Sequence, residues 1–500
     1  MDTTERKYSL IDMIFAILAF GVGLLGYFMV ENGFALGCGL FFSSACIWAI
    51  LYGMIKKEGE LELKGAAMLI LCIILSFGFS FGERSFLLLI NFFVCVFVYF
   101  YGVYVYFGNR NEKCIGKLFL YDALKVSFLM PLSSLGSFFG ALFAPLRKKG
   151  VKKVGYAFLG LFLAIIPSIL VSNLLANNDP AFNGVINSLF DSFDFERALS
   201  IGFHSLIITI IGFSVTFSSI KKKNSEILSE KSYGEFIDNY RKVDHMIVYF
   251  TIIPLIVIYI TFLFSQLSYF TSAFSGVLPE GETFSSCARR GFFEVCTVAF
   301  INGIMIFFMG LFTKRDENKL RISQKVFSTI LSVLTLGLLS VSISKMLLYI
   351  QEYGLTQKRF YTMVIMGVMC FIFILAIIKQ YYEKLNAILL SVLMCMLVFT
   401  SLIYIKPCNL IASYNIDRYI NGIDEKLDIN AIYDLTTGAG IEKLIDVFDE
   451  INDEDTKDDI VDYISSYYSF ISRRIDDERF LEYYQKPDIE YIGDFLSDKE

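Results

Sequence analysis

Long runs of apolar residues dominate the first 405 positions of the chain, and short polar stretches separate them. A helix needs roughly 20 apolar residues to cross the hydrocarbon core of a bilayer, and about eleven stretches reach that length. The pattern therefore predicts an all-α fold, a polytopic transmembrane helix bundle. The predicted spans lie near 11–30, 34–55, 66–82, 86–107, 154–176, 199–219, 246–268, 291–312, 325–349, 360–379 and 386–405.

Lysine and arginine collect in alternate connections between these runs, and this alternation predicts the orientation of the chain. Basic clusters lie at Arg147–Lys153, Lys221–Lys223 and Lys314–Lys325, whereas the loops Asn177–Arg197 and Ser268–Thr283 contain few cations. Because basic loops stay in the cytoplasm, we expect the N-terminus on that side. An odd number of crossings then places the C-terminal end outside, and one miscounted span would reverse this result.

The apolar run Val126–Leu146 interrupts the alternation. It is long enough to span, but it contains Pro131 and Pro145 and is followed by the cations between Arg147 and Lys153. If it crossed, those cations would lie outside and every later loop would change its sign. We therefore expect 126–146 to be a re-entrant segment or an interfacial helix that lies flat among the headgroups.

Residues 406–500 differ from the preceding part in charge. They contain 24 Asp and Glu against 10 Lys and Arg, a net charge of −14, so the overall −6 leaves the first 405 residues at +8. Apolar residues recur at helical spacing in 441–451 and 460–471, with acids on the other face. We therefore expect an acidic helical extramembrane tail that packs on the membrane part. Its negative charge argues against nucleic acid as a partner.

A charged stretch stands at the start of the predicted span 291–312. Arg290 and Glu294 are four residues apart, so they share one face of a helix and can neutralise each other. Arg289 precedes this pair, and Asn302 lies two turns deeper on a nearby face. These residues form either an interfacial pair with snorkelling arginines or a polar path or anion site at the outer mouth.

Two further polar residues are candidates for a functional role. Lys345 lies near the outer end of the span 325–349, where both snorkelling and a role in substrate or proton binding are open. Asp179 precedes Pro180 after the fifth predicted span, in the order of a helix N-cap and first helical residue. Helix capping is the favoured interpretation for Asp179.

The sequence contains no complete motif for catalysis, metal binding or nucleotide binding. It has two histidines, His204 and His245, and ten cysteines, none of them in a CxxC pair. This composition predicts neither a zinc site nor a disulfide framework, and a Walker A loop is missing. We therefore expect no cofactor and no enzyme activity. The lipid bilayer is the partner that the sequence indicates, and it leaves protein partners and oligomeric state open.

Four ordered motifs resemble an uncharacterised family. They are Asn178–Phe182, Ala288–Glu294, Tyr349–Arg359 and Leu410–Arg418, the last with Leu427 and Asp428 after it. On these motifs the chain resembles domain of unknown function 4173, a set of bacterial multi-pass membrane proteins without an assigned activity. The resemblance covers most of the chain from Leu159 to Ile451. It implies a bacterial plasma membrane protein and makes Arg359 a candidate polar residue, but it implies no activity.

Two classes of function follow from these features. The many predicted spans, the segment 126–146 and the polar residues inside the spans favour a transporter or channel-like protein with an unknown solute. The acidic helical tail and the small number of charges inside the spans favour a membrane-embedded sensor or assembly partner that acts through the tail. A membrane enzyme is the least favoured class.

Overall fold

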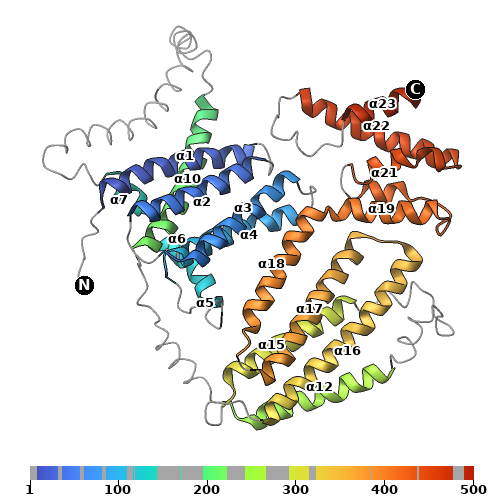
Figure 1. Cartoon of the computed structure of the whole chain (residues 1–500), viewed down its shortest axis with the longest axis horizontal. Coiled ribbons are helices and arrows are strands. Elements are labelled where there is room, and N and C mark those ends of the chain that lie inside the picture. The colour runs from blue at the N-terminus through green and yellow to red at the C-terminus, as the bar shows by residue number, and fades with distance from the viewer. Residues whose placement is uncertain are drawn as a thin grey trace, which may run out of the picture.

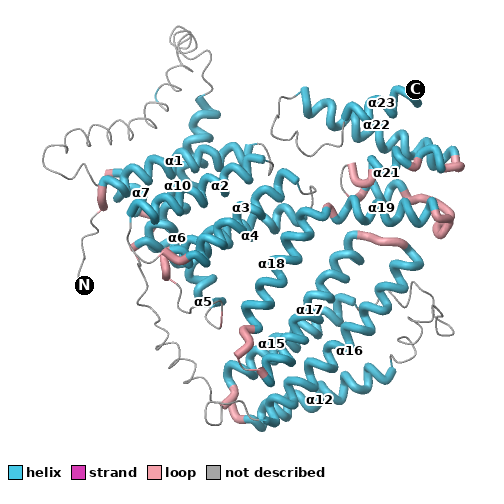
Figure 2. The backbone as a smooth tube through the Cα atoms, in the orientation of Figure 1, coloured by secondary structure: helices cyan, strands magenta, loops and turns pink. Residues whose placement is uncertain are grey.

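The computed structural model describes residues 8–31, 36–56, 61–81, 86–109, 116, 119–143, 171, 195–221, 243–265, 292–314, 322–382, 384–435, 438–476 and 489–499. These residues form helices joined by loops, and no strand occurs among them (Figure 2). Nine of the described helices are long and apolar enough to cross a membrane. The predicted all-α polytopic bundle is therefore confirmed for this part of the chain.

Helices from the first half of the chain pack together as an N-terminal group (Figure 1). Trp48, Tyr52 and Phe213 are buried aromatic residues in contact with one another at its centre. Trp48 Nε1 donates to the carbonyl oxygen of Phe15 at 3.0 Å, because a buried indole N–H needs an acceptor. The group consists of α1 (Leu10–Glu31), α2 (Leu36–Lys56), α3 (Leu63–Phe81), α4 (Phe86–Tyr106) and α10 (Phe195–Ile220).

Helices from the second half form a C-terminal group (Figure 1). Ile252, Leu331 and Leu339 are fully buried between them. Val243 and Thr313 form a parallel bridge, which joins the chain just before the helix that starts at His245 to the chain just after the helix that ends at Phe312. The group consists of α12 (His245–Ser265), α15 (Phe292–Phe312), α16 (Ile322–Tyr353) and α17 (Gln357–Tyr381).

One helix, α18 (Ala387–Ile405), lies between the two groups and touches both (Figure 1). It packs on α17 on one side and on α3 on the other. The side chain of Ile403 occupies the space that a Cβ at Gly78 would fill, so α3 and α18 approach closely at this glycine. The Tyr404 hydroxyl donates a hydrogen bond to the carbonyl oxygen of Ile74.

Ten of the eleven predicted spans coincide with helices that the structure describes. Nine of them coincide with helices of membrane-spanning length, and 291–312 coincides with α15, whose apolar part Glu294–Gly310 is shorter. The predicted span 154–176 lies outside the described residues except for Val171. The helix α16 is longer than 325–349, because it continues through the polar residues Gln351 and Glu352 beyond the apolar run.

Residues 119–143 fold as short helices in place of one long helix. Asp122 accepts a hydrogen bond from the Tyr104 hydroxyl at 3.1 Å, and Ser214 Oγ donates to the carbonyl oxygen of Pro131 at 2.7 Å. These contacts attach the segment to α4 and α10, while its relation to the bilayer stays a prediction. The elements are α5 (Phe119–Leu124), the π-helix η1 (Lys125–Leu129), α6 (Met130–Ser133) and α7 (Ser137–Leu142).

The helices of the tail, residues 406–500, follow α18 (Figure 1), and their described residues form an apolar core of their own. Leu444, Ile460 and Ile464 are fully buried in that core. The tail helices are α19 (Pro407–Ile420), α20 (Ile429–Tyr433), α21 (Ile441–Asp446), the 3-10 helix η3 (Phe448–Glu450), α22 (Glu454–Asp476) and α23 (Ile489–Lys499).

Contacts at helix ends define one side of the N-terminal group. Tyr8, just before α1, stacks on Phe217 near the end of α10, with ring centroids 5.1 Å apart. Lys56 at the end of α2 forms a buried ion pair with Asp12 in the first turn of α1. The start of α1 and the ends of α2 and α10 therefore lie together, on the side that we name the N-side.

The tail is attached on the opposite side. Hydrogen bonds tie the end of α4 to the end of α10 and the start of α3 to the end of α4, so α3 also begins on the N-side. Gly78 and Ile403, which touch, lie in the last turn of α3 and near the end of α18. Since α3 ends away from the N-side, α18 ends there too, and the tail follows it directly. We name this the tail side.

Candidate functional site

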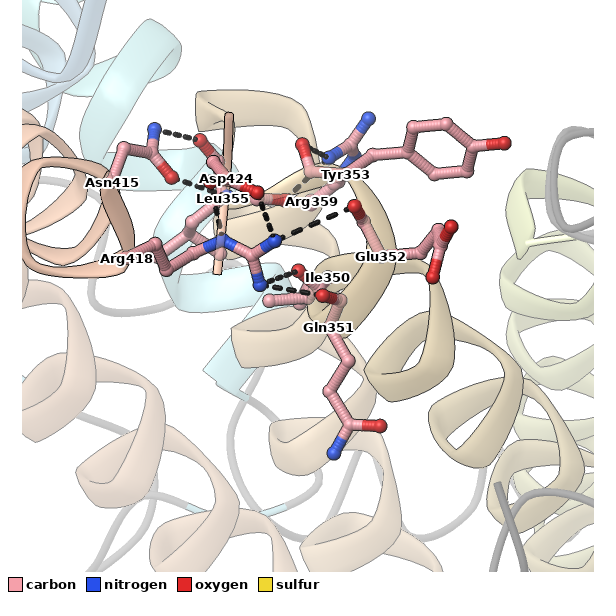
Figure 3. Close-up of polar contacts among 10 residues, drawn as sticks. Ile350, Gln351, Glu352, Tyr353, Leu355, Arg359, Asn415, Arg418 and Asp424 are labelled. Atoms are coloured by element: carbon pink, nitrogen blue, oxygen red, sulfur yellow. Dashed lines mark hydrogen bonds and ion pairs between the residues drawn. The ribbon is translucent and has the colours of Figure 1, made fainter. Parts of the chain in front are cut away.

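The tail meets the C-terminal group at the turn between α16 and α17 (Figure 3). The last carbonyl groups of a helix have no partner inside that helix, and α16 ends at Tyr353. Gly354 leaves the helix with a φ of 71°, in the left-handed region that glycine adopts without a steric penalty. Thr356 then caps α17 by accepting a hydrogen bond from the Arg359 N–H at 3.5 Å.

Arg418, near the end of α19, binds the end of α16 (Figure 3). Its Nη1 donates to the carbonyl oxygens of Gln351 at 2.5 Å and Ile350 at 3.4 Å, and its Nη2 donates to that of Glu352 at 3.4 Å. A cation is favourable there, because the helix dipole makes the C-terminus negative. Only 6% of the Arg418 side chain is exposed. The guanidinium thus donates the hydrogen bonds that the N–H groups of a further helical turn would donate.

The same guanidinium forms a two-pronged ion pair with Asp424. Nε and Nη2 of Arg418 donate to the two carboxylate oxygens at 2.8 and 2.5 Å. This planar geometry is the strongest that an arginine and a carboxylate form. The hydrogen bond to Asp424 raises the pKa of Arg418 above its ordinary value, although burial acts in the opposite direction. The charge of Arg418 is therefore compensated inside the tail itself.

A second arginine, Arg359, binds the remaining carbonyl groups from the other side of the turn. Its Nη1 donates to the carbonyl oxygen of Tyr353 at 2.8 Å and also to that of Gly354. The guanidinium lies over the ring of Tyr349, 4.0 Å from the centroid, in a cation–π contact. The two arginines together serve every carbonyl group from Ile350 to Gly354.

Asn415 pairs with the backbone of Leu355 through both ends of its side-chain amide. Its Nδ2 donates to the carbonyl oxygen of Leu355 and its Oδ1 accepts from the Leu355 N–H, both at 2.8 Å. A Cβ at Gly354 would lie 2.7 Å from Asn415 Oδ1. Glycine is therefore required there for the close approach as well as for the backbone conformation.

The helix α19 connects the two parts through its two faces. Ile411 and Asn415 face the C-terminal group, where Ile411 is fully buried beside Ile350 and Leu355. Cys408, Ala412 and Ile416 lie four residues apart and are fully buried in the core of the tail. Because one helix carries both sets of contacts, any displacement of the tail core moves the residues that hold the end of α16.

The geometry at this junction is suited to binding and positioning. Its groups are two guanidiniums, the amides of Asn415 and Gln357, a carboxylate and backbone carbonyls, and each is engaged in a contact within the protein. Among the described residues, no group of three or more His, Cys, Asp or Glu side chains is arranged to hold a metal ion. The junction therefore holds the tail against the turn between α16 and α17.

The residues predicted around the eighth span are only partly described. Asp179, Arg289 and Arg290 lie outside the described residues. Glu294 is exposed in the first turn of α15. The predicted pairing of Arg290 with Glu294 therefore stays a prediction, and so does the capping role of Asp179.

Asn302 lies in a buried polar cluster within the C-terminal group. Its Oδ1 accepts from the Tyr259 hydroxyl and its Nδ2 donates to Thr335 Oγ1, each at 2.9 Å. The cluster connects α12, α15 and α16, as polar residues between membrane helices commonly do. Lys345 is half-buried on α16. Of the predicted residues that the structure describes, Arg359 is the one at the junction, and neither Asn302 nor Glu294 lies with it.

Sequence reasoning alone did not identify Asn415, Arg418 or Asp424 as functional candidates. A signal was available, because Asn415 and Arg418 belong to the motif Leu410–Arg418 and Arg359 belongs to the motif Tyr349–Arg359. The structure brings these two motifs together, which their order along the chain could not reveal.

The chain also matches a known family. The family model described as a domain of unknown function, DUF4153, matches residues 45–440. This match supports an uncharacterised family, as the motifs indicated, but the number differs from the family 4173 that they resembled. Neither a curated protein nor a solved structure matches the chain.

Proposed function

Because the chain belongs to the DUF4153 family, whose description names no activity, we propose its function from the junction: it is a membrane-embedded sensor or assembly protein whose tail acts on α16 and α17. The apolar helices make it an integral membrane protein. The family resemblance supports a bacterial plasma membrane, and the distribution of cations supports a cytoplasmic N-terminus and an external tail.

One observation carries the proposal. A charged side chain of the tail, Arg418, is buried against the last carbonyl groups of the longest described helix, α16, which runs for 32 residues. A surface arginine that only increases solubility would be exposed, and the carbonyl groups of an exposed helix end can bind water instead. The interaction links the position of the tail to one rigid helix that packs on α12, α15 and α17.

The consequence can be measured at the far end of the helix pair. Tyr381, at the end of α17, touches α16 through a hydrogen bond from Thr329 Oγ1 to its hydroxyl at 3.2 Å. It lies about 36 Å from the start of α17 at 1.5 Å per residue. A fluorine-19 label on this ring, introduced as 3-fluorotyrosine, therefore reports on the contact between α16 and α17 on the N-side.

The test compares two matched variants of the full chain in lipid nanodiscs. We expect Arg418→Gln to shift the fluorine resonance of Tyr381, because the end of α16 loses its charged partner. Glu425→Gln removes a charge from an exposed position beside Asp424 and should leave the resonance unchanged. Thr329→Ala, which removes the contact at the label, sets the scale. An Arg418→Gln spectrum identical to that of the native chain would contradict the proposal.

A second candidate function, transport of an unknown solute, is favoured by the polar cluster of Tyr259, Asn302 and Thr335 inside the C-terminal group. Polar residues at this depth are costly and mark solute pathways in some membrane proteins. Transport predicts that the reconstituted chain increases proton or ion leak through liposomes, measured with a pH-sensitive dye, and that Asn302→Leu removes the leak. No leak above that of empty liposomes would exclude proton or ion conduction.

A further inference from the structure

We propose that the junction is a reversible latch, from which the tail can detach as a folded unit with the ion pair of Arg418 and Asp424 intact. This inference rests on the proposed function and adds how the tail acts. Detachment removes Arg418 and Asn415 from the end of α16, and reattachment restores both contacts. The two states differ in whether the tail holds the carbonyl groups of α16.

The distribution of charge favours reversibility. Arg418 and Asp424 both belong to the tail, and the Ile423 N–H donates to the carbonyl oxygen of Arg418 at 2.9 Å, which closes the loop between them. The pair therefore stays together when the tail leaves. Removing only one partner of a buried ion pair is strongly destabilising, because it leaves an uncompensated charge. A latch that carries both partners avoids that penalty.

The membrane side of the junction is also prepared for detachment. Arg359 lies on α17, so it keeps its hydrogen bonds to Tyr353 and Gly354 without the tail. The carbonyl groups that lose Arg418 lie beside the exposed residues Gln351 and Glu352. They are therefore at a surface where water can replace the guanidinium. The backbone of Leu355 and the side chain of Gln357, which donates to the carbonyl oxygen of Leu435 at 2.9 Å, lose their partners in the tail, and reattachment restores these hydrogen bonds.

The backbone provides a pivot at Lys406, between α18 and α19. Lys406 is the residue that separates the two helices, and its φ of 54° is the one positive value at a non-glycine among the described residues. The side chain at this position forms no hydrogen bond to the start of α19. Rotation at this one residue moves Arg418 at the far end of a helix about 20 Å long.

The tail has what it needs to remain folded when detached. Its core of Leu444, Ile460 and Ile464 contains residues of the tail alone. The Tyr463 hydroxyl donates to the carbonyl oxygen of Ala439, a bond that also lies inside the tail. Loss of the junction therefore leaves these contacts unchanged.

A single amide proton reports directly on the latch. The Leu355 N–H belongs to the membrane part, and its acceptor is the side chain of Asn415 in the tail. Amides of Ile416 in α19 and Leu444 in the tail core are protected by the tail's own structure. The exchange rate of an amide reports the free energy of the smallest opening motion that exposes its N–H to water. Detachment without unfolding therefore exposes Leu355 alone.

The experiment measures exchange at these three amides in the full chain in nanodiscs, after correction for intrinsic rates. In the native chain we expect Leu355 to exchange at least 10-fold faster than Ile416 and Leu444. Arg418→Gln should accelerate Leu355 a further ~10- to 100-fold, the range for losing a hydrogen bond to a charged group. Asp424→Asn should act in the same direction, and Glu425→Gln should change nothing.

Two results would overturn the latch. Equal exchange at Leu355 and Ile416 in the native chain would mean that the junction opens only when the tail unfolds. Parallel acceleration of all three amides in both Arg418→Gln and Asp424→Asn would mean the same. The two experiments distinguish the latch from the proposed function. If the Leu355 amide exchanges fast but the Tyr381 resonance does not shift in Arg418→Gln, the proposed function alone is rejected. If the Leu355 amide exchanges as slowly as Ile416 but the Tyr381 resonance shifts, the latch alone is rejected.

Discussion

Asn415 exchanges two hydrogen bonds with the backbone of Leu355, both at 2.8 Å, across 60 residues of sequence. The amide satisfies one N–H and one carbonyl group, as a neighbouring strand would. We predict that Asn415→Ala lowers the stability of the junction by about 1–3 kcal/mol, because it leaves two backbone groups without their partner. Thermal unfolding of the solubilised chain measures this change.

The matched control is Asn421→Ala, which removes the same side chain just after α19. Asn421 is exposed and donates only to the carbonyl oxygen of Asp417 in its own helix end. Exposed substitutions of this kind usually change stability by no more than about 0.5 kcal/mol. Equal losses in the two variants would show that the bonds between Asn415 and Leu355 add nothing to the junction.

The ion pair of Arg418 and Asp424 predicts non-additive effects. Each single substitution, Arg418→Gln or Asp424→Asn, leaves the other charge without its partner near the end of α16. The double variant removes both charges, so we expect its loss of stability to be smaller than the sum of the two single losses, by about 0.5–3 kcal/mol. A double-mutant cycle on unfolding midpoints measures the difference. Strictly additive losses would contradict a direct pair in solution.

The sequence predicted the membrane helices well, because length and unbroken apolar character are sufficient to identify them. The helices α17 and α18 were expected at 360–379 and 386–405 and lie at Gln357–Tyr381 and Ala387–Ile405. The junction could not be predicted in the same way. Arg418 binds backbone carbonyl groups of α16, and a carbonyl group has no sequence signature. The motif Leu410–Arg418 therefore gave no indication that Arg418 binds the end of α16.

Because the backbone of Lys406 is left-handed, we expect two substitutions at this position to differ in their effect on stability. Lys406→Asn should be nearly neutral, because asparagine tolerates this conformation better than other residues with a Cβ. Lys406→Val should destabilise the native arrangement by more than 1 kcal/mol, since a β-branched side chain is disfavoured at positive φ, on the scale of about 1–2 kcal/mol. Unfolding midpoints of both variants in one detergent check the order. A valine variant as stable as the asparagine variant would mean that the residue is not held left-handed.

The close contact between Gly78 and Ile403 predicts how the two groups are joined. Gly78→Ala places a methyl group where the Ile403 side chain lies, and overpacking of this kind costs about 1–3 kcal/mol. Gly21→Ala in α1 is the control, because its Cβ would enter open space, and a helical glycine replaced by alanine gains about 0.5–1 kcal/mol. We expect opposite signs in thermal unfolding. A Gly78→Ala/Ile403→Ala double variant should recover part of the loss if the clash is its cause.

The start of α1 and the end of α18 lie at opposite ends of the helix bundle. Tyr8 stacks on Phe217 at the N-side, whereas Ile403, near the end of α18, touches Gly78 in the last turn of α3 at the other side. The N-terminus and the tail should therefore be found on opposite faces of the membrane. The cation distribution adds which face is which, with the N-terminus in the cytoplasm.

Reporter fusions at the two ends test separately whether the ends lie on opposite faces and whether the N-terminus is cytoplasmic. A fluorescent protein that folds only in the cytoplasm should be bright at the N-terminus and dark after Glu500, and alkaline phosphatase after Glu500 should be active. The reverse pattern at both ends would keep the arrangement of helices and reject the orientation derived from lysine and arginine. If both ends were found on the same face of the membrane, the arrangement of helices itself would be rejected. The contact between α3 and α18 at Gly78 places the end of α18, and the tail that follows it, away from the N-side.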